Sequence, residues 1–475
     1  MKVLITGANG YIGRRLKRWM LQERSVSVRL MVRNIRSISI PDGTNLEVVE
    51  GSTFDTVSLE RALDGVDVAY YLIHSMASGE HYRELDRQSA ENFREAAIAK
   101  GVRRIVYLGG LGVKESASEH LLSRIETGEI LSAKPERVQC LWFRAGVIIG
   151  SGSASFEIIR NLVQKLPVMI TPQWVQTRAQ PIGVHDVVRY LDAAKDLNVP
   201  GNLVIDIGAE VMSYKEMMEK TAGVMGLRRR LIPVPLLTPG LSSFWLGLFT
   251  PVPVSIARAL IEGLRSEAVR RNRVADDLFA FRPEPFEQAV REAIDEIERQ
   301  QVISRWSDGG GEAWEREHAK DIADALFVDR RVEELGEVTP SRLFAVICCI
   351  GGERGWFSYS LLWQLRGLAD KLLGGAGLNR GRRCETALRI GDTIDFWKVV
   401  DLVPERRLLL YAQMKLPGRA WLEFRIDGGK LCQSAYFYPN GLAGRIYWYA
   451  MLPFHFFIFR DMAKTLMKRA AETVG

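Results

Sequence analysis

The residues best placed to do chemistry stand near the start of the chain, in the run Thr6-Gly7-Ala8-Asn9-Gly10-Tyr11-Ile12-Gly13. A strand pattern precedes this run and a helix pattern follows it. Gly7 permits a tight turn, Gly10 lets the backbone approach a pyrophosphate, and Gly13 lets helix and strand pack closely. The helix start then offers free N–H groups and a positive dipole end to the phosphates. In this context the glycine spacing predicts a dinucleotide site.

The end of the second predicted strand bears on which dinucleotide is bound. A site for NAD usually places Asp or Glu there, to bind the ribose 2′-hydroxyl. Here the strand 26–32 is followed by Arg33-Asn34, with no acid nearby. Arg33 can pair bidentately with a 2′-phosphate, and Arg14 can add charge. We therefore expect NADP rather than NAD, the alternative being that Arg33 is a solvated strand end beside bound NAD.

The elements that must position this site follow from the first 200 residues, where short apolar runs alternate with amphipathic stretches. This order predicts an α/β fold with a doubly wound parallel sheet of the NAD(P)-binding Rossmann type, covered by helices on both faces. The predicted strands are 2–6, 26–32, 46–50, 68–73, 104–108 and 138–143, and the predicted helices 10–21, 59–63 and 82–100.

Two further regions complete the predicted organisation. Residues 201–300 carry helical patterns at 214–225, 254–264 and 287–299 between proline-rich connectors, which suits a small helical cap on the substrate side. Residues 1–300 would then form one NAD(P)-binding domain. Residues 301–326 include the run Ser307-Asp-Gly-Gly-Gly-Glu312 and are predicted to be a linker.

The composition changes after the linker, because seven of the eleven tryptophans lie beyond residue 300. Strands grouped together and followed by a terminal helix predict an α+β domain over 327–475. Pro453 should kink or break the terminal helix. The predicted strands are 327–335, 385–390, 393–403, 406–414, 420–427 and 431–438, and the predicted helices 341–350 and 444–471.

Further motifs in residues 1–300 carry a family resemblance. The glycine run, Gly51-Ser-Thr-Phe-Asp55, Val106-Tyr-Leu108 and Phe143-Arg144-Ala-Gly146 resemble the atypical and extended short-chain dehydrogenase/reductases, in their NmrA-like and nucleoside-diphosphate-sugar-epimerase-like branch. The resemblance implies that Asp55 lies beside the adenine and that Ile73-His74-Ser75 lines the cofactor. The residues expected to contact the cofactor are Thr6, Gly7, Asn9, Gly10, Tyr11, Ile12, Gly13, Arg14, Arg33, Asp55, Ile73, His74 and Arg144.

The segment Gln180-Pro-Ile-Gly-Val-His-Asp186 resembles the stretch that lies between substrate and core in this family. The alternative is a strand–helix junction capped by Asp186.

The catalytic positions of the family depart from its pattern in this chain. The family uses a Ser after the fifth strand and a Tyr-x-x-x-Lys helix, whereas this chain has Gly109-Gly110 and His120-x-x-x-Arg124. Imidazole titrates near neutral pH, so His120 can replace the tyrosine as acid/base, and Arg124 on the same helix face can hold the ribose.

Two alternatives to this assignment stay open. His120 can be an ordinary histidine, with the cofactor bound but not turned over. Otherwise another nearby group can serve, such as Tyr82, with Ser116 or Ser118 in place of the missing serine.

Residues of about 327–472 resemble a domain of unknown function that is often fused behind such reductases, similar to the helix-grip, START/polyketide-cyclase-like superfamily. The stretches 338–344, 350–352, 391–397 and 417–424 carry the likeness. It implies a curved antiparallel sheet around the terminal helix, with an apolar cavity for a lipid-like or aromatic ligand. The alternative is that the tryptophans simply fill the core.

The composition limits the kinds of partner and the cellular compartment that we expect. The net charge is +7, but the basic runs are too short for the stripe of a nucleic-acid binder. Five cysteines without zinc-type spacing indicate reduced thiols in the cytoplasm and no metal. The apolar segments 241–261 and 446–459 predict buried or interfacial helices, one of them a candidate for peripheral membrane contact. The oligomeric state is left open.

These patterns together predict an NADP(H)-binding oxidoreductase acting on a hydrophobic carbonyl or enone that the C-terminal domain helps to hold. The alternative is a non-catalytic NADP(H)-sensing regulatory or lipid-binding protein. A sugar-nucleotide epimerase is disfavoured, because the tyrosine that it usually needs is absent.

Overall fold

The structure is a computed structural model. It describes residues 1–35, 38, 44–74, 82–234, 250, 262–263, 266–308, 325–357, 359–372, 375, 377 and 382–472. The chain divides into two compact units. Unit 1 comprises Met1–Phe249 and Ser255–Glu312, and unit 2 comprises Thr250–Val254 and Ala313–Gly475. Most of the predicted helix 254–264, most of the predicted linker, and Ser75 lie outside the described residues.

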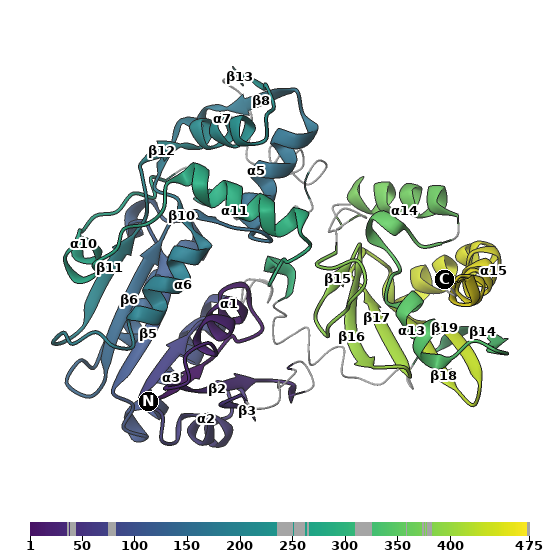
Figure 1. Cartoon of the computed structure of the whole chain (residues 1–475), viewed down its shortest axis with the longest axis horizontal. Coiled ribbons are helices and arrows are strands. Elements are labelled where there is room, and N and C mark those ends of the chain that lie inside the picture. The colour runs from purple at the N-terminus through teal and green to yellow at the C-terminus, as the bar shows by residue number, and fades with distance from the viewer. Residues whose placement is uncertain are drawn as a thin grey trace. The chain divides into compact units, whose positions relative to one another are not determined.

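A seven-stranded parallel sheet forms the centre of unit 1, in the order β11-β6-β5-β4-β1-β2-β3 (Figure 1). The order reverses between β1 and β4, which is where open α/β sheets bind their ligands. The strands are β1 (Lys2–Ile5), β2 (Ser27–Val32), β3 (Leu46–Glu50), β4 (Val68–Tyr71), β5 (Arg104–Gly110), β6 (Gln139–Ala145) and β11 (Leu203–Ile207).

Helices cover both faces of this sheet, because alternate residues of each strand point to opposite sides. Val3 and Ile5 of β1 belong to one apolar core with α1 and α6, whereas Leu4 belongs to a second core with α2, α3 and α4. The covering helices are α1 (Tyr11–Met20), α2 (Thr56–Leu63), α3 (Tyr82–Ala99), α4 (Glu119–Leu131) and α6 (Val184–Ala193). The predicted parallel sheet of the Rossmann type is confirmed.

The first part of the range 201–300 was wrongly predicted to belong to the helical cap. Its strand β11 pairs in parallel with β6 and so extends the main sheet. Its short, ordinary strand sequence gave no sign of which sheet it would join. The remaining described parts of unit 1 include four helices and six short strands that form two-stranded pairs. They are α5 (Ala154–Lys165), α7 (Tyr214–Val224), α10 (Val274–Leu278), α11 (Phe286–Glu298), β7 (Ile148–Ile149), β8 (Val168–Pro172), β9 (Arg178–Ala179), β10 (Ile182–Gly183), β12 (Met212–Ser213) and β13 (Arg230–Val234).

Unit 2 is built on a six-stranded antiparallel sheet in the order β14-β19-β18-β17-β16-β15, against which the long helix α15 packs. Trp356, Trp363 and Trp397 lie in its apolar core with Phe459 and Met462 of α15. Its elements are β14 (Phe327–Glu334), α13 (Pro340–Ile347), α14 (Ser360–Leu372), β15 (Thr393–Ile394), β16 (Trp397–Val403), β17 (Arg407–Ala412), β18 (Gly418–Asp427), β19 (Lys430–Pro439) and α15 (Gly441–Glu472).

Three predictions for unit 2 were wrong. No strand forms over 385–390, where the Asp392 carboxylate accepts a hydrogen bond from the Arg389 N–H (2.9 Å) and so ties the segment into a loop. The strand predicted over 393–403 is two strands, because Asp395 turns the chain with φ +53°. Helix α15 continues through Pro453, since buried side chains anchor it on both sides of that residue. Within the described residues, no helix is both long and apolar enough to cross a membrane.

Candidate functional site

The glycine loop after β1 has the close approaches that its sequence predicts. Gly7 has φ +64°, and a Cβ there would lie 2.3 Å from the carbonyl oxygen of Leu72. A Cβ on Gly13 would lie 2.3 Å from the carbonyl oxygen of Gly7. At Gly10 the nearest atom would be that same oxygen at 3.1 Å. Gly7 and Gly13 therefore let the backbone fold tightly, and Gly10 keeps open the side from which a pyrophosphate would approach.

The start of α1 is suited to an anion. Gly10 is its N-cap and supplies no side-chain cap, and the first turn has no acidic residue. The N–H groups of this turn are thus available to phosphate oxygens. The buried Arg14 side chain lies against the loop, with its Nε donating to the Asn9 carbonyl at 2.9 Å. Thr6 links the ends of β1 and β4, since its hydroxyl donates to the Tyr70 carbonyl at 2.9 Å.

Two other residues of the predicted loop serve packing with their side chains. The Tyr11 hydroxyl lies beside Gly150, where a Cβ would come within 2.6 Å of it, and burial raises the pKa of this phenol. Ile12 packs on the core that β1 shares with α1 and α6. Their N–H groups at the helix start, rather than their side chains, are the parts suited to a phosphate.

Arg33 and Asp55 lie after β2 and β3 respectively. Arg33 is partly exposed and directly follows β2. Asp55 is the N-cap of α2, and its carboxylate accepts a hydrogen bond from the Val57 N–H at 3.2 Å. A hydrogen bond from Ser58 lowers the pKa of this exposed carboxyl. Asp55 therefore caps α2, and it does so at the position that the resemblance places beside the adenine.

A buried polar cluster lies beyond the end of β4. The Nδ1 of His74 lies 3.0 Å from Oδ2 of Asp86, and the Ser123 hydroxyl donates to the same oxygen at 2.8 Å. Asp86 is only 3% exposed. The Nε2 of His74 is buried and has no hydrogen-bond partner within the described part of the chain. Burial lowers the pKa of His74 despite the nearby carboxylate, which favours the neutral ring with its proton on Nδ1.

His120 and Arg124 of α4 lie beside this cluster. The ring centre of His120 is 6.3 Å from that of His74. A Cβ on Gly110, at the end of β5, would lie 3.9 Å from Nη1 of Arg124. Burial, together with the positive charge of Arg124, lowers the pKa of His120. The structure therefore brings His74, His120 and Arg124 together where the expected serine and tyrosine are absent.

The sequence analysis missed Asp86 and Ser123. Asp86 carries a usable signal, because it continues the buried stripe Ala90, Phe93 and Ala97 of α3 at helical spacing. A carboxyl on an apolar stripe needs a buried partner. Ile73 packs against the core on the same side of the sheet. Of the residues considered as substitutes, Ser118 caps α4, Ser116 is exposed, and the Tyr82 side chain lies outside the described atoms.

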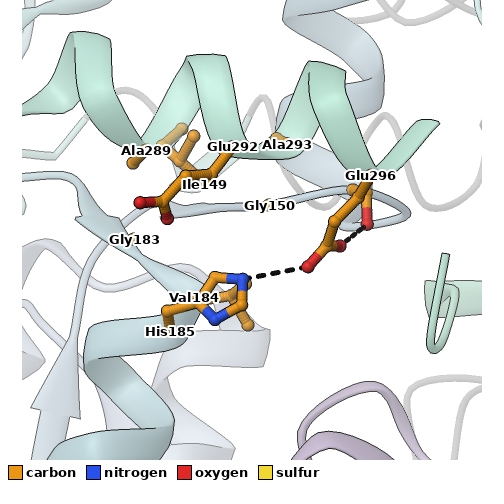
Figure 2. Close-up of a pocket in the computed structure, with 10 residues that line it drawn as sticks. Ile149, Gly150, Gly183, Val184, His185, Ala289, Glu292, Ala293 and Glu296 are labelled. Atoms are coloured by element: carbon orange, nitrogen blue, oxygen red, sulfur yellow. Dashed lines mark hydrogen bonds and ion pairs between the residues drawn. The ribbon is translucent and has the colours of Figure 1, made fainter. Parts of the chain in front are cut away.

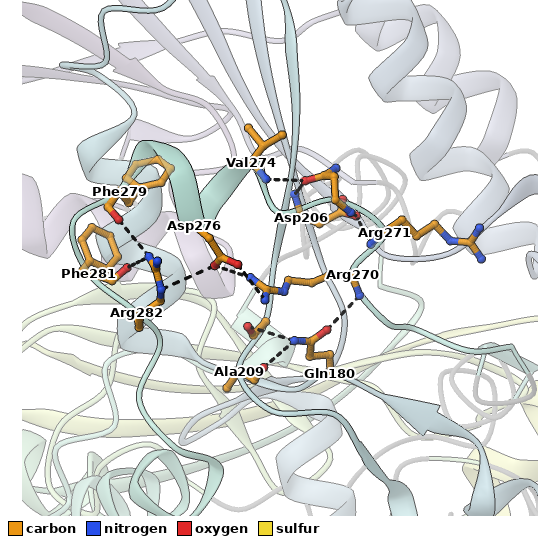
Figure 3. A network of polar contacts seen from close by, with 12 residues as sticks. Gln180, Asp206, Ala209, Arg270, Arg271, Val274, Asp276, Phe279, Phe281 and Arg282 are labelled. Carbon is orange, nitrogen blue, oxygen red and sulfur yellow. Dashed lines mark hydrogen bonds and ion pairs between the residues drawn. The ribbon is translucent and has the colours of Figure 1, made fainter.

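Arg144, predicted to contact the cofactor, forms an ion pair within the sheet. Its Nε and Nη2 donate to the two carboxylate oxygens of Asp206 on β11, at 2.6 and 3.0 Å. Asp206 is fully buried and also accepts from the Arg271 N–H at 2.7 Å (Figure 3). Nearby, Arg270 pairs with Asp276 at 2.9 Å. Arg144 therefore helps to anchor the 270–276 segment beside β6 and β11, and its charge is already matched.

The stretch 180–186 leads into α6, whose N-cap is Gly183. The strand–helix junction of that alternative is present, because β10 ends at Gly183 and α6 begins at Val184, but Asp186 does not cap the helix. Its carboxylate accepts from the Glu284 N–H at 2.8 Å, and burial raises its pKa.

A small crevice separates α6 from α11. The His185 Nε2 lies 2.9 Å from Oε1 of Glu296 (Figure 2). Arg15 donates to both oxygens of the same carboxylate. This ion-pair network joins α1, which begins at the glycine loop, to α6 and α11.

Comparisons with known proteins agree with this geometry. Residues 7–140 match the family described as NAD(P)H-binding, and residues 322–462 match a protein family of unknown function, DUF2867. Unit 1 contains an NAD(P)-binding domain. The match in unit 2 is to a family without a known activity.

Two curated relatives are reductases. The (4-alkanoyl-5-oxo-2,5-dihydrofuran-3-yl)methyl phosphate reductase of Streptomyces griseus is 30% identical over 172 residues, 35% of this chain and 57% of the relative. The ceramide reductase of Caulobacter vibrioides is 28% identical over 247 residues, 50% of this chain and 76% of the relative. The first match thus spans little more than half of that relative's length. A triphenylmethane reductase from Citrobacter sp. shares the fold, with a TM-score of 0.51 and 19% identity over 62% of this chain and all of its own.

Proposed function

We propose that this chain is an NADP(H)-dependent oxidoreductase that acts on a hydrophobic carbonyl or enone. One observation carries the proposal: His74, His120 and Arg124 gather at the ends of β4 and β5, beside the glycine loop that follows β1. This edge is where the strand order reverses, so a dinucleotide held by the loop would present its reactive end toward the cluster.

The cofactor would be held chiefly by the backbone of the glycine loop and the start of α1. The Arg14 guanidinium, which lies against the loop, adds positive charge there. Arg33, partly exposed after β2, supports NADP over NAD, because a guanidinium can bind a 2′-phosphate bidentately. Asp55 would lie beside the adenine, and Ile73 would line the cofactor site. When bound, the nicotinamide supplies or accepts the hydride.

His120 is the proposed acid/base. In reduction it donates the proton that the substrate oxygen takes up while the carbonyl carbon receives the hydride, and solvent then restores the proton. Its lowered pKa leaves the ring neutral around neutral pH, which suits the reverse step of accepting a proton from an alcohol. Arg124 would hold the nicotinamide ribose. The His74–Asp86 pair fixes the ring that packs beside His120.

The substrate class rests on unit 2 and on the relatives. The antiparallel sheet packed on one long helix supports a helix-grip, START-like domain, a type of fold suited to holding apolar ligands. Two of the curated relatives are named as reductases, one of them for ceramide. The domain division 1–300, 301–326 and 327–475 belongs to the same proposal. All five cysteines are free, which supports a reducing, cytoplasmic setting.

A second candidate function is a non-catalytic NADP(H) sensor that regulates a partner or binds lipid. Glycine at Gly110 and the His120–Arg124 pair, in place of Ser and Tyr-x-x-x-Lys, favour it. Such a protein would keep the glycine loop and lose turnover.

Turnover by the purified full-length chain separates these functions. We expect NADPH oxidation with at least one member of a panel of hydrophobic ketones and enones, lost in His120→Ala and kept in His185→Ala, a histidine on α6. Calorimetry should show that His120→Ala still binds NADPH. Binding without turnover by any panel member would support the sensor. No heat with either NADPH or NADH would refute both functions.

A further inference from the structure

Helix α15 of unit 2 has two contrasting faces. One face is buried against the antiparallel sheet and α13, and includes Trp448, Ile458, Phe459, Met462 and Leu466. These residues recur at helical spacing along one side. Figure 1 shows α15 beside the sheet and α13 of its own unit.

The opposite face is apolar and exposed over the first half of the helix. Leu442 is 74% exposed, Ile446 60%, Tyr449 61%, Phe456 48% and Phe457 58%. Their spacing of four, three, seven and one residues places all five on one side of a helix with 3.6 residues per turn. We call these five residues the outer stripe. Monomeric proteins seldom expose so many large apolar side chains together, so the outer stripe indicates a contact surface.

The same side of α15 becomes basic over its second half. Arg460 and Lys464 are exposed and continue the helical spacing of the outer stripe. Arg445, also exposed, lies near its other end. Residues 441–460 contain no acid, and the whole helix carries five basic residues against two acidic ones. The partner of this face should therefore be apolar in part and negatively charged.

We propose that α15 docks unit 2 on the surface of an anionic phospholipid bilayer. The outer stripe would enter the boundary between headgroups and acyl chains, and Arg460 and Lys464 would contact lipid phosphates. From Leu442 to Phe457 the helix rises only about 22 Å, and it lies along unit 2, so this is attachment at one surface. A second copy of the chain fits less well, because it would bring the same basic side chains against either themselves or the outer stripe. This inference is independent of the proposed reductase activity.

Vesicle flotation of the full-length chain tests the proposal. We expect binding to phosphatidylcholine vesicles that contain phosphatidylglycerol, weaker binding without it, and further weakening as salt is raised. Arg460→Gln with Lys464→Gln should reduce affinity for the anionic vesicles about 30-fold. Ile446→Ser with Phe457→Ser should reduce it at least about tenfold on both kinds of vesicle.

Matched controls come from exposed residues of unit 1. Val57→Ser removes a 77% exposed apolar side chain, and Arg18→Gln with Arg24→Gln removes two exposed charges, so none of these should change flotation. All variants should bind NADPH as the parent chain does. Flotation that is absent, or unchanged in both α15 variants, would overturn the proposal. So would a dimer in sedimentation that dissociates in Ile446→Ser/Phe457→Ser without vesicle binding, since the occupant would then be a second copy.

Discussion

Replacing Glu296 by glutamine should destabilise unit 1 without changing its packing volume. The carboxylate accepts from Arg15 Nη1 and Nη2 at 3.2 and 2.9 Å and lies 2.9 Å from His185 Nε2. The Arg15 side chain is 3% exposed and that of Glu296 16%. Burial alone would raise the pKa of Glu296, but the hydrogen bonds from His185 and Arg15 outweigh it and lower the pKa to about 2.

The pKa shift sets the size of the effect. A fall from 4.5 to about 2, at about 1.4 kcal/mol per unit, corresponds to about 3 kcal/mol of stability at neutral pH. Breaking a buried ion pair by removing one partner costs roughly 3–5 kcal/mol, which agrees. We therefore expect Glu296→Gln to lower the free energy of unfolding of unit 1 by about 3 kcal/mol.

Titration of the Glu296 carboxyl should make the effect depend on pH in the acid range. The folded pKa of Glu296 lies below the unfolded one, so its contribution is complete above pH 4.5 and is lost as pH falls toward 2. The difference between the parent chain and Glu296→Gln should shrink in acid over that range.

Hydrogen exchange of amides in α1 and α11 is the appropriate assay, because a chain with two units need not unfold in one step. Glu298→Gln, an exposed position on the same helix, is the control. A loss below about 1 kcal/mol, or one that stays constant through the acid range, would refute the assignment of Glu296 as the charge that holds these helices together.

Three further predictions concern the cofactor and the proton. Gly10→Val should leave unit 1 folded, since a Cβ there meets only one oxygen at 3.1 Å. It should weaken NADPH binding about ten- to hundredfold, because the larger side chain displaces the phosphate from charged hydrogen bonds. Equal losses of stability in thermal melting and of affinity in titration would contradict this prediction. Arg33→Ser should weaken NADPH by a similar factor and leave NADH unchanged, as fluorescence titration of both coenzymes would reveal. Because the pKa of His120 is lowered, carbonyl reduction should fall as pH rises through a midpoint below 6.5, and alcohol oxidation should rise; a pH profile with the midpoint above that value would argue against His120.

Local patterns carried the sequence predictions that succeeded. The buried parallel strands β1 and β4 are largely continuous apolar runs, so each could be recognised by itself. The glycine loop was equally accessible, because Gly7, Gly10 and Gly13 act on backbone atoms a few residues away.

Contacts between distant segments account for what the sequence did not predict. Asp86 meets Ser123 across 37 residues, and Arg144 meets Asp206 across 62. Neither pairing follows from spacing along the chain. Helix α14 (Ser360–Leu372) was also missed, and the strand expected over 385–390 fails because the side chain of Asp392 binds backbone that a ladder would need.

The orientation of the His74 ring implies that its Nε2 atom favours an alcohol over the corresponding ketone. With its proton directed at Asp86, the ring presents a lone pair at Nε2 and nothing to donate. An alcohol beside that nitrogen can donate a hydrogen bond to it, whereas the corresponding ketone would place its acceptor oxygen against an acceptor nitrogen. Turning the ring over would cost Asp86 one of its hydrogen-bond donors and leave only others such as Ser123, so the fold favours this preference at Nε2.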